Sequence, residues 1–128
     1  MKKSKDVFLY YNRNPKKKEL EDCVCRAIST ATGLNYYAVE NLLNLSAYLN
    51  HCDKLCVCCY HKLLEGILCY HVRKCRYGET VKDVALRHKD KKVIIRIEQH
   101  LTCAIYGKVS DIWNCADKIV DCYWIVPS

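Results

Sequence analysis

The last third of the sequence constrains the fold most, because it breaks into four short β-rich runs joined by short turns. The runs are KKVIIRIE, HLTCAIY, VSDIWN and KIVDCYWIV, and a Tyr-Gly-Lys turn lies between the second and the third. Val, Ile and aromatic residues favour strands, and short turns join antiparallel neighbours. This part of the chain therefore predicts a compact antiparallel sheet of about four strands.

The first two thirds of the chain carry helical patterns instead. Asp22 precedes the run CVCRAISTAT, whose apolar residues recur at helical spacing until Gly33. Asn35 precedes a second run of this kind. Asp and Asn are favoured N-cap residues and glycine often follows the last helical turn, so both runs predict helices.

Three further elements complete the predicted fold. The segment DKLCVCCYHKLLEGIL predicts a third helix from about Asp53 to Gly66, and Thr80 is placed to cap a short helix over VKDVALRH. Residues 6–11, DVFLYY, predict a first strand. Helices that precede a compact sheet indicate an α+β fold, with N-terminal helices packed on a C-terminal antiparallel sheet.

Length and composition indicate one folded domain over residues 1–128. Hydrophobic residues make up 51% and charged residues 27% of the chain, a balance typical of globular rather than disordered proteins. No stretch is apolar for long enough to cross a membrane or to act as a signal peptide, so we expect a cytoplasmic protein. The net charge of +7 is spread over several segments, so nucleic-acid binding is not favoured.

The chain contains 11 cysteines, too many for small core residues alone. Because their number is odd and no export signal is expected, a disulfide framework explains them poorly. In a reducing compartment, such an excess points to metal binding, to a reactive thiol, or to both.

Cys23 is the thiol best placed to react, because it directly follows the predicted N-cap of a helix. The unpaired N–H groups and the dipole at a helix N-terminus favour the thiolate, which is the nucleophilic form. Cys25 lies two residues further along and faces a different side of the helix. We therefore expect Cys23 rather than Cys25 to be the reactive thiol.

His100 is the histidine best placed to act as a base for this thiol. It opens the run HLTCAIYGKVSDIWN, whose hairpin returns Asp111 and Asn114 toward it. Either residue can hold the ring nitrogen that does not face the thiol. The choice depends on whether the turn has two or three residues, and the sequence leaves it open.

The order of these residues and the segments around them resemble the papain-like cysteine peptidases. The chain is most similar to the small papain-like proteins that bacteriophages and mobile elements encode. The stretches that carry this similarity are NRNP and DCVCRAIS near the start of the chain, and HLTCAIYGKVSDIWNCADK and CYWIV near its end. The resemblance leaves residues 47–78 unmatched, and it implies a papain-like fold and thiol-dependent hydrolysis of a peptide or amide bond.

Carried over residue by residue, the resemblance implies Cys23 as nucleophile, His100 as base and Asp111 as orienting group, with Asn114 as its substitute. The sequence departs from the family pattern in one respect. The glutamine that usually precedes the nucleophile and donates to the oxyanion has no counterpart in PKKKELED. The asparagines of NRNP and the backbone N–H of Cys23 are the alternative donors.

The cysteine-rich segment at about residues 51–75 predicts a structural zinc site within a zinc-binding insertion. Two of its cysteines form a C-x2-C pair and a third lies one helical turn earlier, so a helix places their thiols along one face. A tetrahedral zinc site needs four ligands. The segment ILCYHVRKC that follows this helix predicts a strand. The predicted ligands are Cys52, Cys56, Cys59 and, from that strand, Cys75 or else Cys69. The alternative is a helix whose small core residues are cysteines.

The other predicted core residues are Cys25, Cys103, Cys115, Cys122, Trp113 and Trp124.

Two functions fit these patterns. The first is a cysteine peptidase or amide hydrolase that uses the Cys-His-Asp/Asn triad. The second, suggested by the resemblance to phage proteins, is a non-enzymatic, zinc-stapled inhibitor on the same fold. Such an inhibitor would bind a host defence complex in the host cytoplasm, as an anti-CRISPR protein binds a nuclease. Both hypotheses imply a protein substrate or target and need no membrane.

Overall fold

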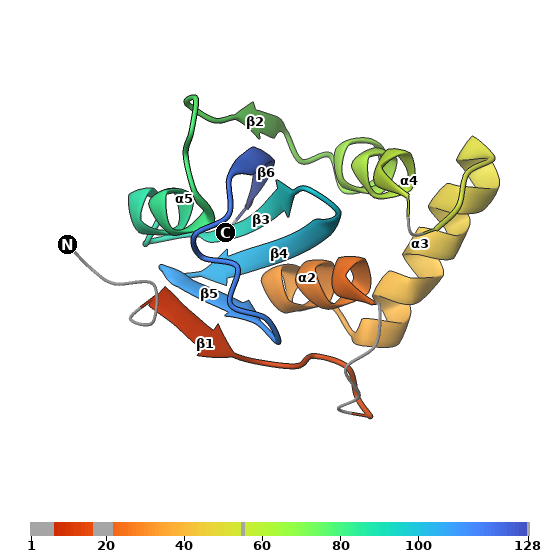
Figure 1. Ribbon diagram of the computed structural model, residues 1–128. Coiled ribbons are helices and arrows are strands. Elements are labelled where there is room, and N and C mark those ends of the chain that lie inside the picture. The colour runs from red at the N-terminus through yellow and green to blue at the C-terminus, as the bar shows by residue number, and fades with distance from the viewer. Residues whose placement is uncertain (1–6, 17–21, 55, 128) are drawn as a thin grey trace.

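Six strands form one mixed β-sheet with helices on both of its faces (Figure 1). The computed structural model describes residues 7–16, 22–54 and 56–127. The strands are β1 (Phe8–Tyr10), β2 (Val72–Lys74), β3 (Lys92–Ile97), β4 (His100–Ile105), β5 (Lys108–Asp111) and β6 (Val120–Val126). The helices are α2 (Cys23–Thr32), α3 (Tyr36–Asn50), α4 (Val57–Lys62), which continues as the π-helix η1 (Leu63–Ile67), and α5 (Val81–Arg87). Residue 6 of the predicted first strand and residues 17–21, before α2, lie outside the described residues.

The α+β class agrees with the sequence prediction, whereas the sheet is larger than predicted. The strand order is β1-β5-β4-β3-β6-β2, and β1 runs parallel to β5, so the sheet is not purely antiparallel. The four predicted runs form its centre, and β1 and β2 add its edges. Each edge strand has only three residues, and all three residues of β2 are exposed. The first strand predicted over residues 6–11 corresponds to β1, but strands this short show no alternation from which their place in the sheet could be predicted.

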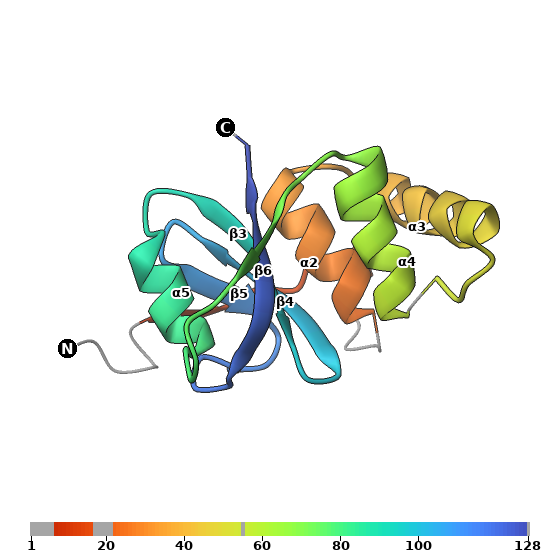
Figure 2. The same ribbon diagram turned by 90° about the horizontal axis from the view of Figure 1, so that it is seen from above.

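The two faces of the sheet carry separate apolar cores. Helices α2, α3 and α4 cover one face and α5 covers the other, as Figure 2 shows from above. Strand β3 contributes to both cores, because Ile94 packs with α2 to α4 while Val93 and Ile95 pack on the α5 side. This double burial explains why Val93, Ile94 and Ile95 follow one another without a polar residue between them. Within the three described ranges, none of the helices has the length and apolar character that a membrane crossing requires.

The predicted caps of α3 and α5 are confirmed, and the predicted cap of α2 is wrong. Asn35 accepts a hydrogen bond from the N–H of Tyr37 at 2.9 Å, and Thr80 forms a capping box with Asp83. Asp22 stands at the N-cap position of α2 but makes no side-chain capping bond. Its carboxylate is instead engaged by three other side chains.

The cysteine-rich segment packs into the same core as α2. Its helix begins after Cys56 rather than near Asp53, because Cys56 is the N-cap and its sulfur accepts from the N–H of Cys59 at 3.4 Å. Helix α4 passes directly into η1, where Leu63 and Leu64 are fully buried. Cys52 and residues 56–68 of the segment are thus built into the fold on one face of the sheet, whereas its residues 72–74 form β2.

Candidate active site

The β4–β5 hairpin positions two residues of the candidate site. It closes through a two-residue turn, Tyr106–Gly107, in which φ is 49° and 85°. Two positive φ values are typical of type I′ turns, which match the twist of the flanking strands. Continuing the register that this turn sets places Asp111 across from Thr102. His100 is the next residue of β4 on that face, so it lies diagonally beside Asp111.

Asp111 is the residue that orients His100. The Nε2–H of the imidazole donates to Oδ2 of Asp111 at 2.7 Å. Asn114 lies beyond the end of β5, is exposed, and accepts from the N–H of Ala116 at 3.2 Å within a turn. The structure therefore brings Asp111, and not the alternative Asn114, to the imidazole.

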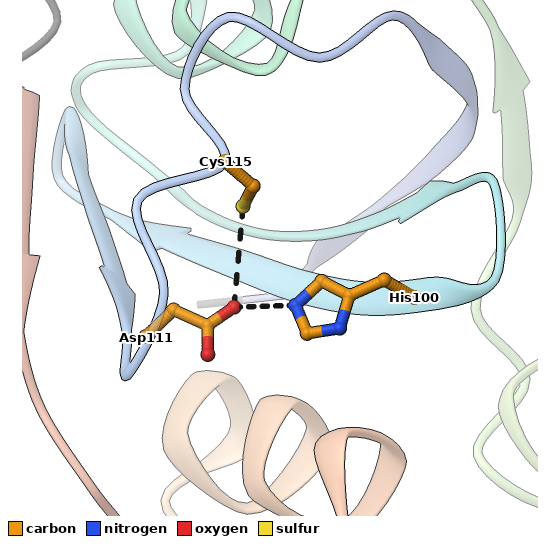
Figure 3. Close-up of side chains that lie close together, drawn as sticks. All are labelled: His100, Asp111 and Cys115. Carbon is orange, nitrogen blue, oxygen red and sulfur yellow. Dashed lines mark hydrogen bonds and ion pairs between the residues drawn. The ribbon is translucent and has the colours of Figure 1, made fainter.

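Cys23 is the first residue of α2, and its partly exposed thiol hydrogen-bonds to the imidazole of His100. The second ring nitrogen of His100 points away from Asp111, as Figure 3 shows, so the ring has a separate edge for the thiol. Burial works to raise the pKa of the Cys23 thiol. Hydrogen bonds to His100 and from the backbone of Leu101, together with the charges of His100 and Arg26, outweigh burial and lower this pKa below its ordinary value of 9.0.

The electrostatics of His100 and Asp111 favour a protonated, positively charged imidazole beside a charged carboxylate. Burial works to lower the pKa of His100, but hydrogen bonds to Asp111, Cys115 and Cys23 outweigh it and raise this pKa well above 6.5. Burial likewise opposes ionisation of Asp111, yet the hydrogen bond and charge of His100 lower its pKa below 3.8. A lowered thiol pKa beside a raised imidazole pKa favours a thiolate–imidazolium pair at neutral pH, and the thiolate is the nucleophilic form of cysteine.

The neighbouring Cys25 has the opposite character. Its buried thiol donates to the backbone oxygen of Tyr36 at 3.3 Å, and burial raises its pKa to about 12. The prediction that Cys25 is a core residue is confirmed. Two thiols only two residues apart thus differ sharply in their readiness to ionise, because only Cys23 reaches the imidazole.

A buried polar cluster fixes the start of α2. Asp22 forms an ion pair with Arg26 one helical turn later. Oδ2 of Asp22 also accepts from Nδ2 of Asn14 at 3.0 Å and from the hydroxyl of Tyr36 at 2.6 Å. Through this ion pair and these hydrogen bonds, the carboxylate links the loop before α2, the helix itself and the start of α3.

Arg26 extends this cluster to the hairpin. Its side chain is only 6% exposed, and Nη2 lies 3.6 Å from Oδ1 of Asp111. Arg26 thus connects the helix start that carries Cys23 to the carboxylate that orients His100. Sequence reasoning missed this residue, although a charged side chain inside an apolar helical run, four residues after Asp22, was a usable signal.

The NRNP segment serves the helix start. Oδ1 of Asn12 accepts from the N–H of Asn14 at 3.0 Å, and Nδ2 of Asn14 is used by Asp22. Both asparagines are buried. The backbone N–H of Cys23 lies in the first turn of α2, where helix N–H groups have no partner within the helix, so it remains the better candidate for an oxyanion donor.

Cys115 and Trp113 also lie beside the imidazole, which the sequence analysis did not predict. Cys115 is buried as predicted, but its thiol donates to Oδ2 of Asp111 at 4.0 Å, as Figure 3 shows. The same thiol also hydrogen-bonds to His100. Trp113 is 43% exposed rather than a core residue, and its ring meets His100 edge-on at a centroid distance of 5.0 Å. Their position close behind Asp111 in the sequence was the only signal for these contacts.

His100, Asp111 and Cys115 are also a potential metal-ligand group, the one found among the described residues, with ligand atoms within 4.8 Å of one another. Imidazole, carboxylate and thiolate are all zinc ligands. However, Nε2 of His100 and Oδ2 of Asp111 are 2.7 Å apart, whereas two such ligands on tetrahedral zinc would be about 3.3 Å apart. The group is compatible with metal binding, but this spacing favours a direct hydrogen bond between His100 and Asp111.

The cysteine-rich segment brings three of its four predicted ligands together. The thiol of Cys52 hydrogen-bonds to Cys56 and Cys59, and burial together with these neighbours raises its pKa to about 12. Cys59 also donates to the backbone oxygen of Leu43 at 3.4 Å. This thiol cluster is compatible with metal binding. Cys75 packs on the α5 side of the sheet whereas Cys52 and Cys56 pack on the other face, so the structure does not bring it to the cluster.

Comparisons of the chain with protein-family models, with curated proteins and with solved structures found no match.

Proposed function

We propose that this protein hydrolyses a peptide or amide bond through Cys23, as a papain-like cysteine peptidase or amide hydrolase. The observation that carries the proposal is the hydrogen-bonded array of Cys23, His100 and Asp111, which come from α2, β4 and β5. A thiol joined to a base that a third group orients is the arrangement of an activated nucleophile. The resemblance of the surrounding segments to papain-like proteins supports the same assignment.

The proposed reaction has two steps. The Cys23 thiolate attacks the carbonyl carbon of the substrate, and the His100 imidazolium then donates its proton to the leaving nitrogen as the carbon–nitrogen bond breaks. An acyl-thioester on Cys23 remains. His100 next takes a proton from the water that attacks the thioester carbon, and the carboxylic acid product leaves as the thiolate forms again. Asp111 keeps the ring in orientation throughout.

A peptide-mixture assay tests this proposal. Incubation of the protein with peptides from a digested proteome will create new peptide termini, which mass spectrometry detects. Cys23→Ala removes the nucleophile, so we expect the rate of new termini to fall by about a thousandfold or more. Cys58→Ala, which removes an exposed thiol of α4, is the matched control and will retain the wild-type rate.

The same assay separates hydrolysis from the alternative of a non-enzymatic inhibitor. If the wild-type protein creates no new termini, or if Cys23→Ala creates them at the wild-type rate, the hydrolase proposal fails. The first of these outcomes favours a protein that uses this fold only to bind a host defence complex.

We further propose that the thiols of Cys52, Cys56 and Cys59 would hold zinc as a structural ion. Three neighbouring thiols support the proposal, since thiolates are preferred zinc ligands. Protein purified without added metal will then contain close to one zinc per chain by elemental analysis. Cys56→Ser will remove this zinc. Cys69→Ser will not, because the thiol of Cys69, the alternative fourth ligand predicted from the sequence, is exposed and donates to the backbone oxygen of Gly66 at 3.6 Å. Wild-type protein without bound zinc would refute the proposal.

A further inference from the structure

Two hollows near the candidate active site share the lining residue Ile119, and we call the two together the trough. The first hollow, about 440 Å³, is lined by Gln99, Ile119 and by Trp113, whose ring packs against His100. The second hollow, about 700 Å³, is also lined by Ile119 and reaches β2. The trough therefore begins at the covered imidazole and ends at the β6–β2 edge of the sheet. The larger hollow alone has the volume of a ligand-binding pocket.

Basic side chains predominate along this trough. Lys118 lies over the ring of Trp113 in the first hollow, with its nitrogen 5.7 Å from the ring centroid. Lys74 and Arg76 line the second hollow, are exposed, and have no ion-pair partner within the described part of the chain. Glu98 is the acidic residue of the first hollow. The exposed, unpaired cations make the far end of the trough the more positive one.

A fixed guanidinium lies in the wall of the second hollow. Arg96 donates from Nη1 to Nε2 of His61 at 2.8 Å and pairs through Nε with Asp121 at 3.5 Å. Nδ1–H of His61 donates to Glu65 at 2.8 Å, and the same carboxylate accepts from the indole N–H of Trp124 at 3.2 Å. This network holds Arg96 in place beside Asp121, which also lines the hollow, so Lys74 and Arg76 are the unpaired cations that an entering anion would meet.

Strand spacing gives the distance from the strand of His100, the partner of the thiol, to this basic end. His100 is on β4, and the second hollow lies at β6 and β2, which are two and three strands away in the sheet order. Neighbouring strands are about 4.8 Å apart, so the separation is about 10–14 Å. An extended peptide advances about 3.3 Å per residue, so about three or four residues span it.

We propose that the trough binds an acidic segment of the peptide substrate, with its carboxylates three or four residues from the bond that Cys23 attacks. The inference rests on the proposed hydrolase function and names its substrate class. Apolar residues of the substrate would contact Ile119, and acidic ones would pair with Lys74 and Arg76. Charge complementarity of this kind sets specificity more than raw affinity.

Peptide binding to the uncleaving Cys23→Ala variant tests the proposal without catalysis. Fluorescent peptides of one length will carry Glu, Gln or Lys at the same positions, and their affinities will be measured at low salt by fluorescence anisotropy. We expect the Glu peptide to bind about five to ten times more tightly than the Gln peptide, from a few partly exposed ion pairs. The Lys peptide will bind more weakly than either.

Charge reversal in the trough gives the matched comparison. Adding Lys74→Glu and Arg76→Glu will abolish the preference for Glu and favour the Lys peptide. Lys89→Glu, an exposed change beside the Tyr106–Gly107 turn at the far end of β4, will leave the preference intact.

Equal binding of the three peptides would overturn the inference, and so would tighter binding of an oligonucleotide of similar length. Failure of the hydrolase proposal is separate, because a protein that cleaves nothing can still show the predicted preference for Glu.

Discussion

Iodoacetamide at neutral pH will alkylate Cys23 first among the 11 cysteines, at a rate at least about tenfold above that of Cys58 and Cys69. Accessibility alone predicts the opposite order, since Cys58 and Cys69 are exposed and Cys23 is only partly so. We nevertheless expect Cys23 to react first, because its pKa is lowered beside the imidazolium of His100. Peptide mapping by mass spectrometry after short labelling times measures the rate at each site.

Replacement of the imidazole isolates its contribution. In His100→Gln the positive neighbour is gone while burial stays, so we expect the pKa of Cys23 to rise and its labelling to become slower than that of Cys58. His71→Gln changes an exposed histidine and will leave the labelling order unchanged. Labelling of Cys23 that is insensitive to His100→Gln would contradict the thiolate–imidazolium pair.

The pH dependence of this labelling follows from the same shift. The thiolate fraction falls as pH drops through the thiol pKa, and the pKa of Cys23 lies below the ordinary 9.0. Alkylation of Cys23 will therefore persist at pH values where ordinary thiols are protonated and unreactive. His100→Gln will move the midpoint of the profile to higher pH. A wild-type midpoint near 9.0 would mean that the thiol is not activated.

Asp22→Ala will have the largest effect on stability, a loss of about 3–5 kcal/mol in the free energy of unfolding. The substitution removes the close ion-pair partner of the buried Arg26 and leaves Asp111, at 3.6 Å, as its remaining carboxylate. It also takes away the acceptor for Asn14 and Tyr36. Urea unfolding followed by circular dichroism measures the loss, and failure to fold is the extreme of the same result.

The control for this prediction is an ordinary helix cap. Asn35→Ala removes the N-cap of α3, whose side chain is exposed and accepts only from the first turn, and it will cost about 1 kcal/mol. If Asp22→Ala costs no more than Asn35→Ala, the ion pair and hydrogen bonds of Asp22 stabilise the fold no more than an ordinary helix cap does. The proposed role of the polar cluster in stability would then be wrong.

The parts of the site that depend on local pattern could be predicted from the sequence. A thiol just after an N-cap position and a histidine at the start of a β-rich run led to Cys23 and His100. The central strands were predictable for a similar reason, because β3 to β6 are long enough to show apolar runs with turns between them. Such patterns depend only on residues close together in the sequence, so they can be recognised before the fold is known.

The parts that depend on long-range packing could not be predicted. The choice of Asp111 over Asn114 required the length of the turn at Tyr106–Gly107, which shifts every side chain beyond it to the other face. The carboxylate of Asp22 was assigned to capping, because nothing local reveals that Arg26 and other side chains engage it. The metal prediction failed at Cys75 for the same reason, since β2 carries the chain to the other face of the sheet.

The protonation state of His100 tests the central claim most directly. NMR of the histidine ring nitrogens across the neutral pH range reports whether each ring carries one proton or two. With Asp111 and Cys23 both charged beside it, the ring of His100 will carry two protons at neutral pH and show no titration near 6.5. A ring that is neutral at this pH, or that titrates near 6.5, would contradict the thiolate–imidazolium pair on which the proposed chemistry depends.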